Sequence, residues 1–391
     1  MGDYMEAIVQ EAIGREGSKK DIEVRERVKV HAPKSAAKSM TTDEELRQIV
    51  DGIRTAIKIV GCGGAGCNTI DRIMEMGVEG GDVIAVNTDA LDLLYTNAYT
   101  KVLIGASITG GIGAGNNPEV GEQCAEADIK KLSEVLEGSD MVFVTCGLGG
   151  GTGTGSAPVV AEVSRDINAL TIGIVTLPFT VEGKFRARNA LIGLKKLRKF
   201  ADTVIVIPND RLLDIAPNLP VNAAFKVADE LLANSVKGIT ELVTKPGLIN
   251  LDFADIKTIM KGGGTAMIGL GSSSKDASSE DRSQESVEKA IKSPLLDADI
   301  STATGALINI TGSRDMTLDE AESIVKIVSE NIDQNAQIIW GAMIDDTLDR
   351  NVIKTMLILS GVKTPQYEEQ LEERVETSSA AEHVDMGLRY V

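Results

Sequence analysis

The sequence predicts a doubly wound parallel α/β domain that is joined by a long central helix to a smaller α+β domain. Short apolar runs alternate with helical stretches up to Pro208, a long helical pattern follows, and a second set of strand-like runs comes after it. Continuously apolar runs rich in β-branched residues are typical of parallel strands that are buried on both faces. Their regular alternation with helices indicates a doubly wound sheet.

The expected elements follow from these patterns. In the first domain we expect strands at 56–60, 83–86, 102–104, 141–145, 171–175 and 204–207, with helical stretches such as 158–166 and 184–200 between them. A helical pattern without Gly or Pro until Gly238 covers 222–243, and Pro246-Gly247 closes it. The second domain has strand candidates at 267–270, 305–310, 336–341 and 355–361, and a polar loop at 271–286. We therefore expect a first domain at 51–220, a central helix at 221–246 and a second domain at 247–362.

Both ends of the chain differ in composition from these domains. Residues 1–50 hold no strand-like run, and we expect a largely disordered extension with one transient amphipathic helix near residues 5–13. The tail, 363–391, is acidic and is expected to be disordered. It ends in a partly apolar peptide, which suits a short linear ligand for a partner protein. The apolar residues of that peptide are Val384, Met386, Leu388, Tyr390 and Val391.

Composition excludes several classes of function. The 391 residues carry a formal net charge of −18, which disfavours nucleic acid and anionic membranes as partners. No apolar run approaches the ~18 residues of a membrane-spanning helix, and the acidic N-terminus is unlike a signal peptide, so we expect a cytoplasmic protein without direct membrane insertion. The four cysteines form no CxxC pair and the chain has two histidines. We expect buried thiols and no dedicated metal site.

The first Gly-rich loop, residues 61–68, joins a predicted strand to a helix that runs to Met76. Glycines let backbone N–H groups approach an anion, and a helix N-terminus adds its positive dipole end. The loop contains a GxGxxG match, and Asp89 falls near the distance expected for a ribose-binding acid. This loop alone therefore leaves open both a dinucleotide site and another phosphate site.

The second Gly-rich loop, residues 147–156, contains GGGTGTG after a predicted strand. We expect it to surround a phosphate with N–H groups, with its threonine hydroxyls donating to phosphate oxygens and Ser156 starting a helix. A third Gly-rich loop, residues 109–116, follows another strand, and three such loops suit a triphosphate. The chain has no GxxxxGK[ST] motif, which excludes a P-loop NTPase. Without a P-loop lysine, backbone dipoles and Mg²⁺ must neutralise the phosphates.

These motifs resemble the tubulin/FtsZ family over residues 56–362. GGGTGTG at 149–155 resembles the tubulin signature, and NTDA at 87–90, GAG at 113–115, NPEVG at 117–121 and NLDFAD at 250–255 resemble FtsZ loops in the same order. The long N-terminal extension and the differing tail suggest an archaeal type. The resemblance implies a tubulin/FtsZ-like fold, GTP and GDP as ligands, and Mg²⁺ bound mainly through the phosphates.

The resemblance also implies which residues contact GTP. Glu182 would bind the ribose and Arg186 would lie near the base and phosphates, although their spacing also suits a surface ion pair. Phe225 would stack on guanine, and Asp229 would accept hydrogen bonds from guanine N1–H and N2–H₂, with Asn209 as a second base contact. Ala228, Ala65 and Cys67 depart from the family pattern. The implied contacts are Gly63, Gly64, Ala65, Gly66, Cys67, Asn68, Asp89, Thr109, Gly113, Ala114, Gly149, Gly150, Gly151, Thr152, Gly153, Thr154, Glu182, Arg186, Asn209, Phe225 and Asp229.

The loop at 250–255 implies how hydrolysis occurs. Carboxylates orient an attacking water, yet they repel a triphosphate that lies beside them. The family resolves this by delivery in trans, so that Asn250, Asp252 and Asp255 of one subunit complete the pocket of the next. The resemblance thus implies a head-to-tail homopolymer that forms a division ring at mid-cell. It further implies that the C-terminal tail binds a membrane-tethering adaptor protein.

Two alternatives belong to other classes. A nicotinamide-dependent oxidoreductase is compatible with the first loop, but the second domain offers no His or Tyr/Lys proton donor. A nucleotide-gated scaffold without hydrolysis would have lost its catalytic carboxylates, whereas Asp252 and Asp255 are intact. We therefore favour an assembly-activated GTPase.

Overall fold

A computed structural model describes residues 55–215, 220–245, 247–274, 277, 281–296 and 298–362. The predicted N-terminal extension and C-terminal tail lie outside the described residues. The strands are β1 (Ile57–Cys62), β2 (Gly81–Asn87), β3 (Thr100–Leu103), β4 (Met141–Gly147), β5 (Leu170–Leu177), β6 (Thr203–Pro208), β7 (Gly264–Ser272), β8 (Gly305–Gly312), β9 (Gln337–Ile344) and β10 (Ile353–Ser360). Each predicted strand is therefore confirmed, with shifted ends.

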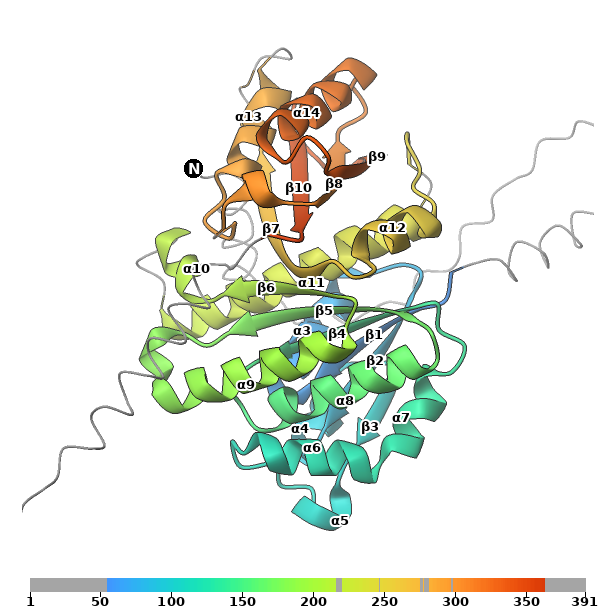
Figure 1. Ribbon diagram of the computed structural model, residues 1–391, viewed down its shortest axis with the longest axis vertical. Helices are drawn as coiled ribbons and strands as arrows, with labels where there is room; N and C mark the ends of the chain where they lie inside the picture. Colours follow the sequence, from blue (N-terminus) through green and yellow to red (C-terminus); the bar gives the residue numbers. More distant parts are fainter. Residues whose placement is uncertain are drawn as a thin grey trace, which may run out of the picture.

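Helices connect these strands. They are α3 (Gly63–Met76), α4 (Ala90–Tyr95), α5 (Ala106–Thr109), α6 (Pro118–Ala127), α7 (Ile129–Leu136), α8 (Thr152–Asp166), α9 (Lys184–Phe200), α10 (Asp210–Ile215), α11 (Val221–Thr244), α12 (Phe253–Met260), α13 (Arg282–Ile291) and α14 (Leu318–Asn331). The predicted central helix is α11, which has 24 residues and is roughly 36 Å long. Figure 1 shows α11 running across the middle of the molecule.

The strands form one ten-stranded sheet in the order β3-β2-β1-β4-β5-β6-β7-β10-β8-β9. Strands β1 to β6 are parallel to their neighbours, as predicted for a doubly wound domain. Strand β10 is antiparallel to both β7 and β8. A short parallel contact between β6 and β7, from Thr203–Gly264 to Ile205–Ala266, joins the two halves of the sheet.

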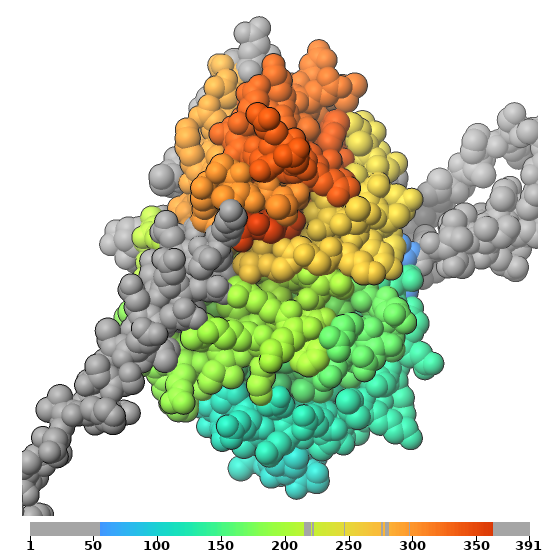
Figure 2. Space-filling model, in the orientation of Figure 1, coloured from blue at the N-terminus to red at the C-terminus, as the bar shows by residue number. Residues whose placement is uncertain are grey.

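Two hydrophobic cores lie on opposite faces of this sheet. Val60 and Val144 contribute to one core with apolar residues of α6, α7, α8 and α9, and the same core extends to α13 and α14. Ile59 and Phe143, which alternate with them, contribute to the other core with α3, α11 and α12. Helices therefore cover both faces, as the continuously apolar strands predict. Figure 2 shows the chain from α12 onward forming an upper lobe above the lobe of β1 to β6.

Three expectations about element ends are wrong. Helix α8 begins at Thr152 and not at Ser156, whose hydroxyl instead donates to the Thr152 carbonyl at 2.7 Å. Helix α3 likewise begins inside the first loop, at Gly63. Glycine has low helix propensity, so these first turns carry no helical signal in the sequence. The predicted loop 271–286 is shorter, because β7 reaches Ser272 and α13 begins at Arg282.

The four cysteines are free and buried, as expected. Of the helices in the described part of the chain, none combines the length and the apolar character needed to cross a bilayer.

Candidate functional site

The carboxyl ends of β1, β4, β5 and β6 surround a cavity of about 260 Å³. Ligands of doubly wound sheets commonly bind at this edge. The cavity is bounded by the starts of α3, α8 and α11, which lie far apart in the sequence. Its lining residues are Cys62, Gly64, Ala65, Gly147, Leu148, Gly150, Gly151, Thr152, Gly153, Thr176, Pro178, Glu182, Arg186, Asn209, Phe225, Ala228 and Asp229.

The second Gly-rich loop offers unpaired backbone donors to this cavity. Thr152 and Gly153 belong to the first turn of α8, where backbone N–H groups have no partner within the helix. Within the described residues, the N–H groups of Gly150 and Gly151 donate to no protein acceptor either. Four successive N–H groups at a helix N-terminus form a concave site suited to phosphate.

The first Gly-rich loop packs directly against the second. Gly63 has a φ of +71°, and a Cβ at this position would lie 2.6 Å from the Gly153 nitrogen. A Cβ on Gly153 would lie 2.9 Å from the Cys62 carbonyl oxygen. Glycine at both positions therefore lets the N-termini of α3 and α8 converge on one cavity. Gly64 and Ala65 of the first loop line it.

The third Gly-rich loop lies behind the second and does not line the cavity. Thr88 links the two, since its Oγ1 lies 2.6 Å from Thr152 Oγ1 and its carbonyl accepts from the Gly113 N–H at 3.2 Å. A Cβ on Gly151 would lie 3.1 Å from the Ala114 Cβ. The carboxylate of Asp89 caps α4 by accepting from the N–H groups of Leu91 and Asp92. The phosphate contacts expected from this loop stay predictions.

An aromatic and polar group forms the other end of the cavity. The ring of Phe225 is 39% exposed and meets Phe179 edge to face at 5.2 Å between centroids. One face of this ring is therefore available for stacking. The side chain of Asn209 is buried, and its Oδ1 accepts no hydrogen bond from the described residues. A buried acceptor without a partner is costly, and a donor on a ligand in the cavity would satisfy it.

Asp229 lies on α11, one turn after Phe225. Burial, together with the nearby charges of Asp71 and Glu230, raises the pKa of its carboxyl to about 8, while a hydrogen bond with Thr69 acts in the opposite direction. A ligand that donates two hydrogen bonds would stabilise the ionised form. The chemistry of Phe225, Asn209 and Asp229 thus fits a flat, donor-bearing ring such as guanine.

Glu182 and Arg186 both line the cavity and form an ion pair at 2.6 Å. Glu182 Oε1 also accepts from the Phe179 N–H at 2.8 Å, which fixes the turn that precedes α9. Arg186 is about half exposed, so its guanidinium is accessible to a charged ligand. The surface ion pair and the predicted ligand contact are therefore compatible in one arrangement.

The structure does not bring the loop 250–255 to this cavity. Asn250, Asp252 and Asp255 are exposed and lie beyond the far end of α11. Asp229 stands fifteen residues before Thr244, the last residue of α11, which is roughly 22 Å along the helix axis. Asp252 and Asp255 form a capping box at the start of α12, in which Asp255 accepts from the Asp252 N–H at 3.3 Å. Asn250 Oδ1 accepts from the Gly247 N–H.

Ten of the predicted ligand contacts lie outside the cavity lining. They are Gly63, Gly66, Cys67, Asn68, Asp89, Thr109, Gly113, Ala114, Gly149 and Thr154. Thr154 faces away from the cavity, and its hydroxyl accepts from the Gly149 N–H at 2.8 Å, so it supports the second loop from behind. Sequence reasoning missed Thr69, Thr88 and Phe179, which hold Asp229, Thr152 and Phe225. Thr88 lies within the NTDA motif at 87–90, but the sequence does not reveal any of these three contacts, because the partners come from distant segments.

Among the described residues, the cavity has neither a cluster of side chains that could hold a metal ion nor a reactive thiol. In the described ranges, no three His, Cys, Asp or Glu side chains gather in a way that could hold a metal ion. Cys62 lines the cavity, but burial raises the pKa of its thiol to about 12. A thiol of this kind is a poor nucleophile at neutral pH.

Comparisons with known proteins agree with this geometry. Residues 56–217 match the family model described as Tubulin/FtsZ family, GTPase domain, and residues 264–363 match FtsZ family, C-terminal domain. The chain is 57% identical to cell division protein FtsZ of Methanothermobacter thermautotrophicus, over 88% of each chain. It is 54% identical to cell division protein FtsZ 1 of Pyrococcus furiosus, over 89% of this chain and 93% of the relative. The solved FtsZ dimer of M. jannaschii superimposes with a TM-score of 0.77 at 53% identity, covering 82% of this chain and 92% of that chain.

Proposed function

Because the chain belongs to the tubulin/FtsZ family and carries its GTPase domain, we propose that it is a self-assembling GTPase of cell division whose active site forms between two subunits. Each subunit binds GTP in the cavity at the edge of its sheet. The loop 250–255 of the next subunit then supplies Asn250, Asp252 and Asp255. Hydrolysis is thereby coupled to the formation of a head-to-tail filament.

Binding of GTP follows from the lining of the cavity. The N–H groups of residues 150–153 receive the phosphates, while Phe225 stacks on guanine. The carboxylate of Asp229 accepts from guanine N1–H and N2–H₂, and Asn209 Oδ1 accepts a further hydrogen bond. Adenine lacks this donor pattern, so the site discriminates against ATP. Mg²⁺, held through the phosphates of GTP, supplies positive charge that a site without a P-loop lysine lacks.

In the hydrolytic step, a water oxygen attacks the γ-phosphorus and the bond from that phosphorus to the β–γ bridging oxygen breaks. GDP and inorganic phosphate leave. A carboxylate of the neighbouring subunit, Asp252 or Asp255, orients the water and accepts its proton. The phosphate-binding groups need not tolerate these negative charges until two subunits meet.

One observation carries this proposal. Two exposed carboxylates and an exposed amide lie on the same chain as the cavity, yet they follow the end of α11, which is roughly 22 Å along the helix axis from the base-binding residue Asp229. They cannot act on a ligand in their own subunit without a large rearrangement. A second subunit provides the shortest route by which they reach a γ-phosphate.

The test measures phosphate release with GTP and with ATP over a range of protein concentrations. We expect specific activity with GTP to rise steeply with concentration, because only assembled subunits have a complete site. A specific activity that does not depend on concentration would contradict a shared site.

A mixing experiment isolates delivery in trans. Asp255→Ala keeps the cavity, whereas Gly151→Ala would place a Cβ 2.8 Å from the Asn117 nitrogen and damage the phosphate site. Each variant alone should be inactive, and a co-assembled mixture should regain activity, because one intact cavity can meet one intact loop. Activity no greater than the sum of the separate proteins, in a mixture shown to co-assemble, would refute the mechanism.

In the cell, the proposal places these filaments at mid-cell as a division ring. The C-terminal peptide, through apolar residues 384–391, would bind an adaptor protein that tethers the filament to the membrane.

A further inference from the structure

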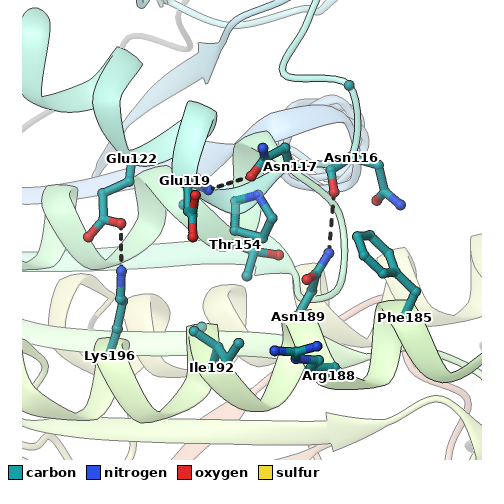
Figure 3. A pocket seen from close by; sticks show the side chains of 14 residues that line it. Asn116, Asn117, Glu119, Glu122, Thr154, Phe185, Arg188, Asn189, Ile192 and Lys196 are labelled. Atoms are coloured by element: carbon teal, nitrogen blue, oxygen red, sulfur yellow. Dashed lines mark hydrogen bonds and ion pairs between the residues drawn. The ribbon is translucent and has the colours of Figure 1, made fainter. Parts of the chain in front are cut away.

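A second cavity, of about 390 Å³, lies behind the second Gly-rich loop. It is bounded by α6, α8 and α9, and Thr154 is part of its wall. Figure 3 shows the side chain of Asn189 rising from α9 into this region, toward the backbone of Asn116. The two cavities therefore lie on opposite sides of the loop that we expect to hold phosphate.

Asn189 is 6% exposed and makes two hydrogen bonds to backbone. Its Nδ2 donates to the Asn116 carbonyl at 3.2 Å and to the Gly149 carbonyl at 3.2 Å. Carbonyl oxygens only accept, so the side chain must present its amide nitrogen to both. One buried amide thus uses both its N–H bonds to join the end of the third Gly-rich loop to the second.

The bond to Gly149 has a consequence for the next residue. In a planar trans peptide, the C=O of Gly149 and the N–H of Gly150 point in opposite directions. Because Asn189 holds the Gly149 oxygen from behind, the Gly150 N–H turns to the other side, where Gly150 lines the first cavity. Thr154 Oγ1 accepts the Gly149 N–H at 2.8 Å, so the peptide groups on both sides of Gly149 are fixed.

Gly149 needs this support from outside the loop. Its φ of +113° lies in the region that favours glycine, and no side chain of its own restricts it. The N–H of Gly150 has no protein acceptor among the described residues, so nothing on the cavity side holds the peptide. Without Asn189, the Gly149 carbonyl would lose its partner and the peptide would be free to rotate.

We propose that Asn189 is a positioning residue for phosphate binding, which orients the Gly150 N–H toward the nucleotide and fixes the third Gly-rich loop against the second. The inference rests on the proposed function, because it assumes that the second loop binds the phosphates of GTP. Asn189 touches no substrate and acts through Gly149 and Asn116.

The test substitutions are Asn189→Asp and Asn189→Ala. The aspartate has nearly the same shape, but its carboxylate cannot donate and faces two carbonyl oxygens. The alanine removes both donors without adding charge, which gives a second variant if the aspartate variant does not fold. Asn309→Asp is the matched control, since Asn309 is also buried at 5% and its Nδ2 donates to a backbone carbonyl, that of Gly238, at 3.2 Å.

Binding of GTP and of guanosine is measured for each protein, together with thermal unfolding. We expect the Asn189 variants to bind GTP about tenfold to a hundredfold more weakly, while guanosine affinity stays within about twofold, because only phosphate contacts are lost. The Gly150 amide proton should shift on GTP addition in the unsubstituted chain and not in the variants. Asn309→Asp should lower thermal stability and leave GTP affinity unchanged.

Three results would overturn the inference. Unchanged GTP affinity in both Asn189 variants would remove the positioning role. An equal loss of GTP and guanosine affinity would make Asn189 a general structural residue. Failure of the unsubstituted chain to bind GTP would refute the proposed function itself. This outcome is distinguishable from the other two because it is measured on the unsubstituted protein alone.

Discussion

We predict that Asp229→Asn weakens GTP binding and at the same time stabilises the nucleotide-free protein. The substitution keeps the size of the side chain and removes its charge. In the free protein, burial and the neighbouring Asp71 and Glu230 disfavour the carboxylate and raise its pKa to about 8. With guanine bound, the N1–H and N2–H₂ donors of the base would favour the ionised carboxylate of Asp229. The same group therefore opposes folding and supports binding.

The expected loss of GTP-binding free energy follows from two opposing contributions. Paired hydrogen bonds to a buried carboxylate contribute on the order of 2–4 kcal/mol. Ionising a carboxyl of pKa about 8 at pH 7 costs about 1.4 kcal/mol. The net loss in the variant is then about 1–3 kcal/mol, or roughly fivefold to a hundredfold in affinity at pH 7. Discrimination against ATP should fall in parallel.

The sign of the stability effect follows from proton linkage. The native state keeps a proton on Asp229 up to about pH 8, whereas the unfolded chain loses it near pH 4. The free energy of unfolding therefore falls as pH rises from about 4 to about 8. Asparagine has no such proton, so the variant should be more stable at pH 7, by on the order of 2–4 kcal/mol after allowing for solvent screening.

The assay is calorimetric titration with GTP and ATP at pH 6 to 8.5, combined with thermal unfolding without nucleotide. Asp229 is about 1% ionised at pH 6 and about half ionised at pH 8, so GTP affinity should rise with pH in the unsubstituted chain relative to the variant. The ratio of the GTP affinities of the two proteins cancels the titration of GTP itself. A ratio that is independent of pH, or equal GTP affinity in both proteins, would refute the reasoning.

Three further predictions follow from the fold and the tail. Asp255→Ala, and to a lesser extent Asp252→Ala, should still bind GTP and sediment as filaments but release little phosphate; normal release would remove these carboxylates from the mechanism. Gly155→Ala should lower the free energy of unfolding by about 1–3 kcal/mol or more, because its Cβ would lie 2.1 Å from the Pro118 carbonyl oxygen. Gly150→Ala is the control: its Cβ meets nothing within 4 Å, so its unfolding temperature should equal that of the unsubstituted chain. Deleting 383–391 should leave GTP hydrolysis and assembly intact and abolish recruitment to the membrane, seen by fluorescence microscopy; a ring formed by the truncated protein would assign tethering to another segment.

The strands, and the place of the second Gly-rich loop at the cavity, could be predicted from sequence because their signals are local. Buried parallel strands appear in the sequence as apolar runs, and a GGGTGTG loop has few uses other than binding an anion such as phosphate. The starts of α3 and α8 could not be predicted, since glycine carries no helical signal. The contact between β6 and β7 joins Thr203 to Gly264 over a long stretch of chain, and no local pattern encodes it.

The residues of the candidate site also fall into those that could be predicted from the sequence and those that could not. The place of Phe225 and Asp229 at the cavity could be predicted, because the family resemblance points to both residues and their i, i+4 spacing on a long helix puts them on one face. The role of Asn189 could not be predicted, because it is a single polar residue in a basic helix. Its importance comes from the carbonyls of Asn116 and Gly149, which are 73 and 40 residues away in the sequence. Thr69 and Thr88 act through similar contacts. Positions of this kind become visible only when the chain is folded.

The capping box at the start of α12 bears on how fast a filament could begin to hydrolyse GTP. The side chains of Asp252 and Asp255 are tied to backbone N–H groups of their own helix, so each holds a defined rotamer in the isolated subunit. Fixing a free carboxylate side chain would otherwise add an entropic barrier to the reaction at every new junction. In the proposed mechanism this ordering is complete before the subunits collide, and each docking event presents a catalytic edge that is already assembled.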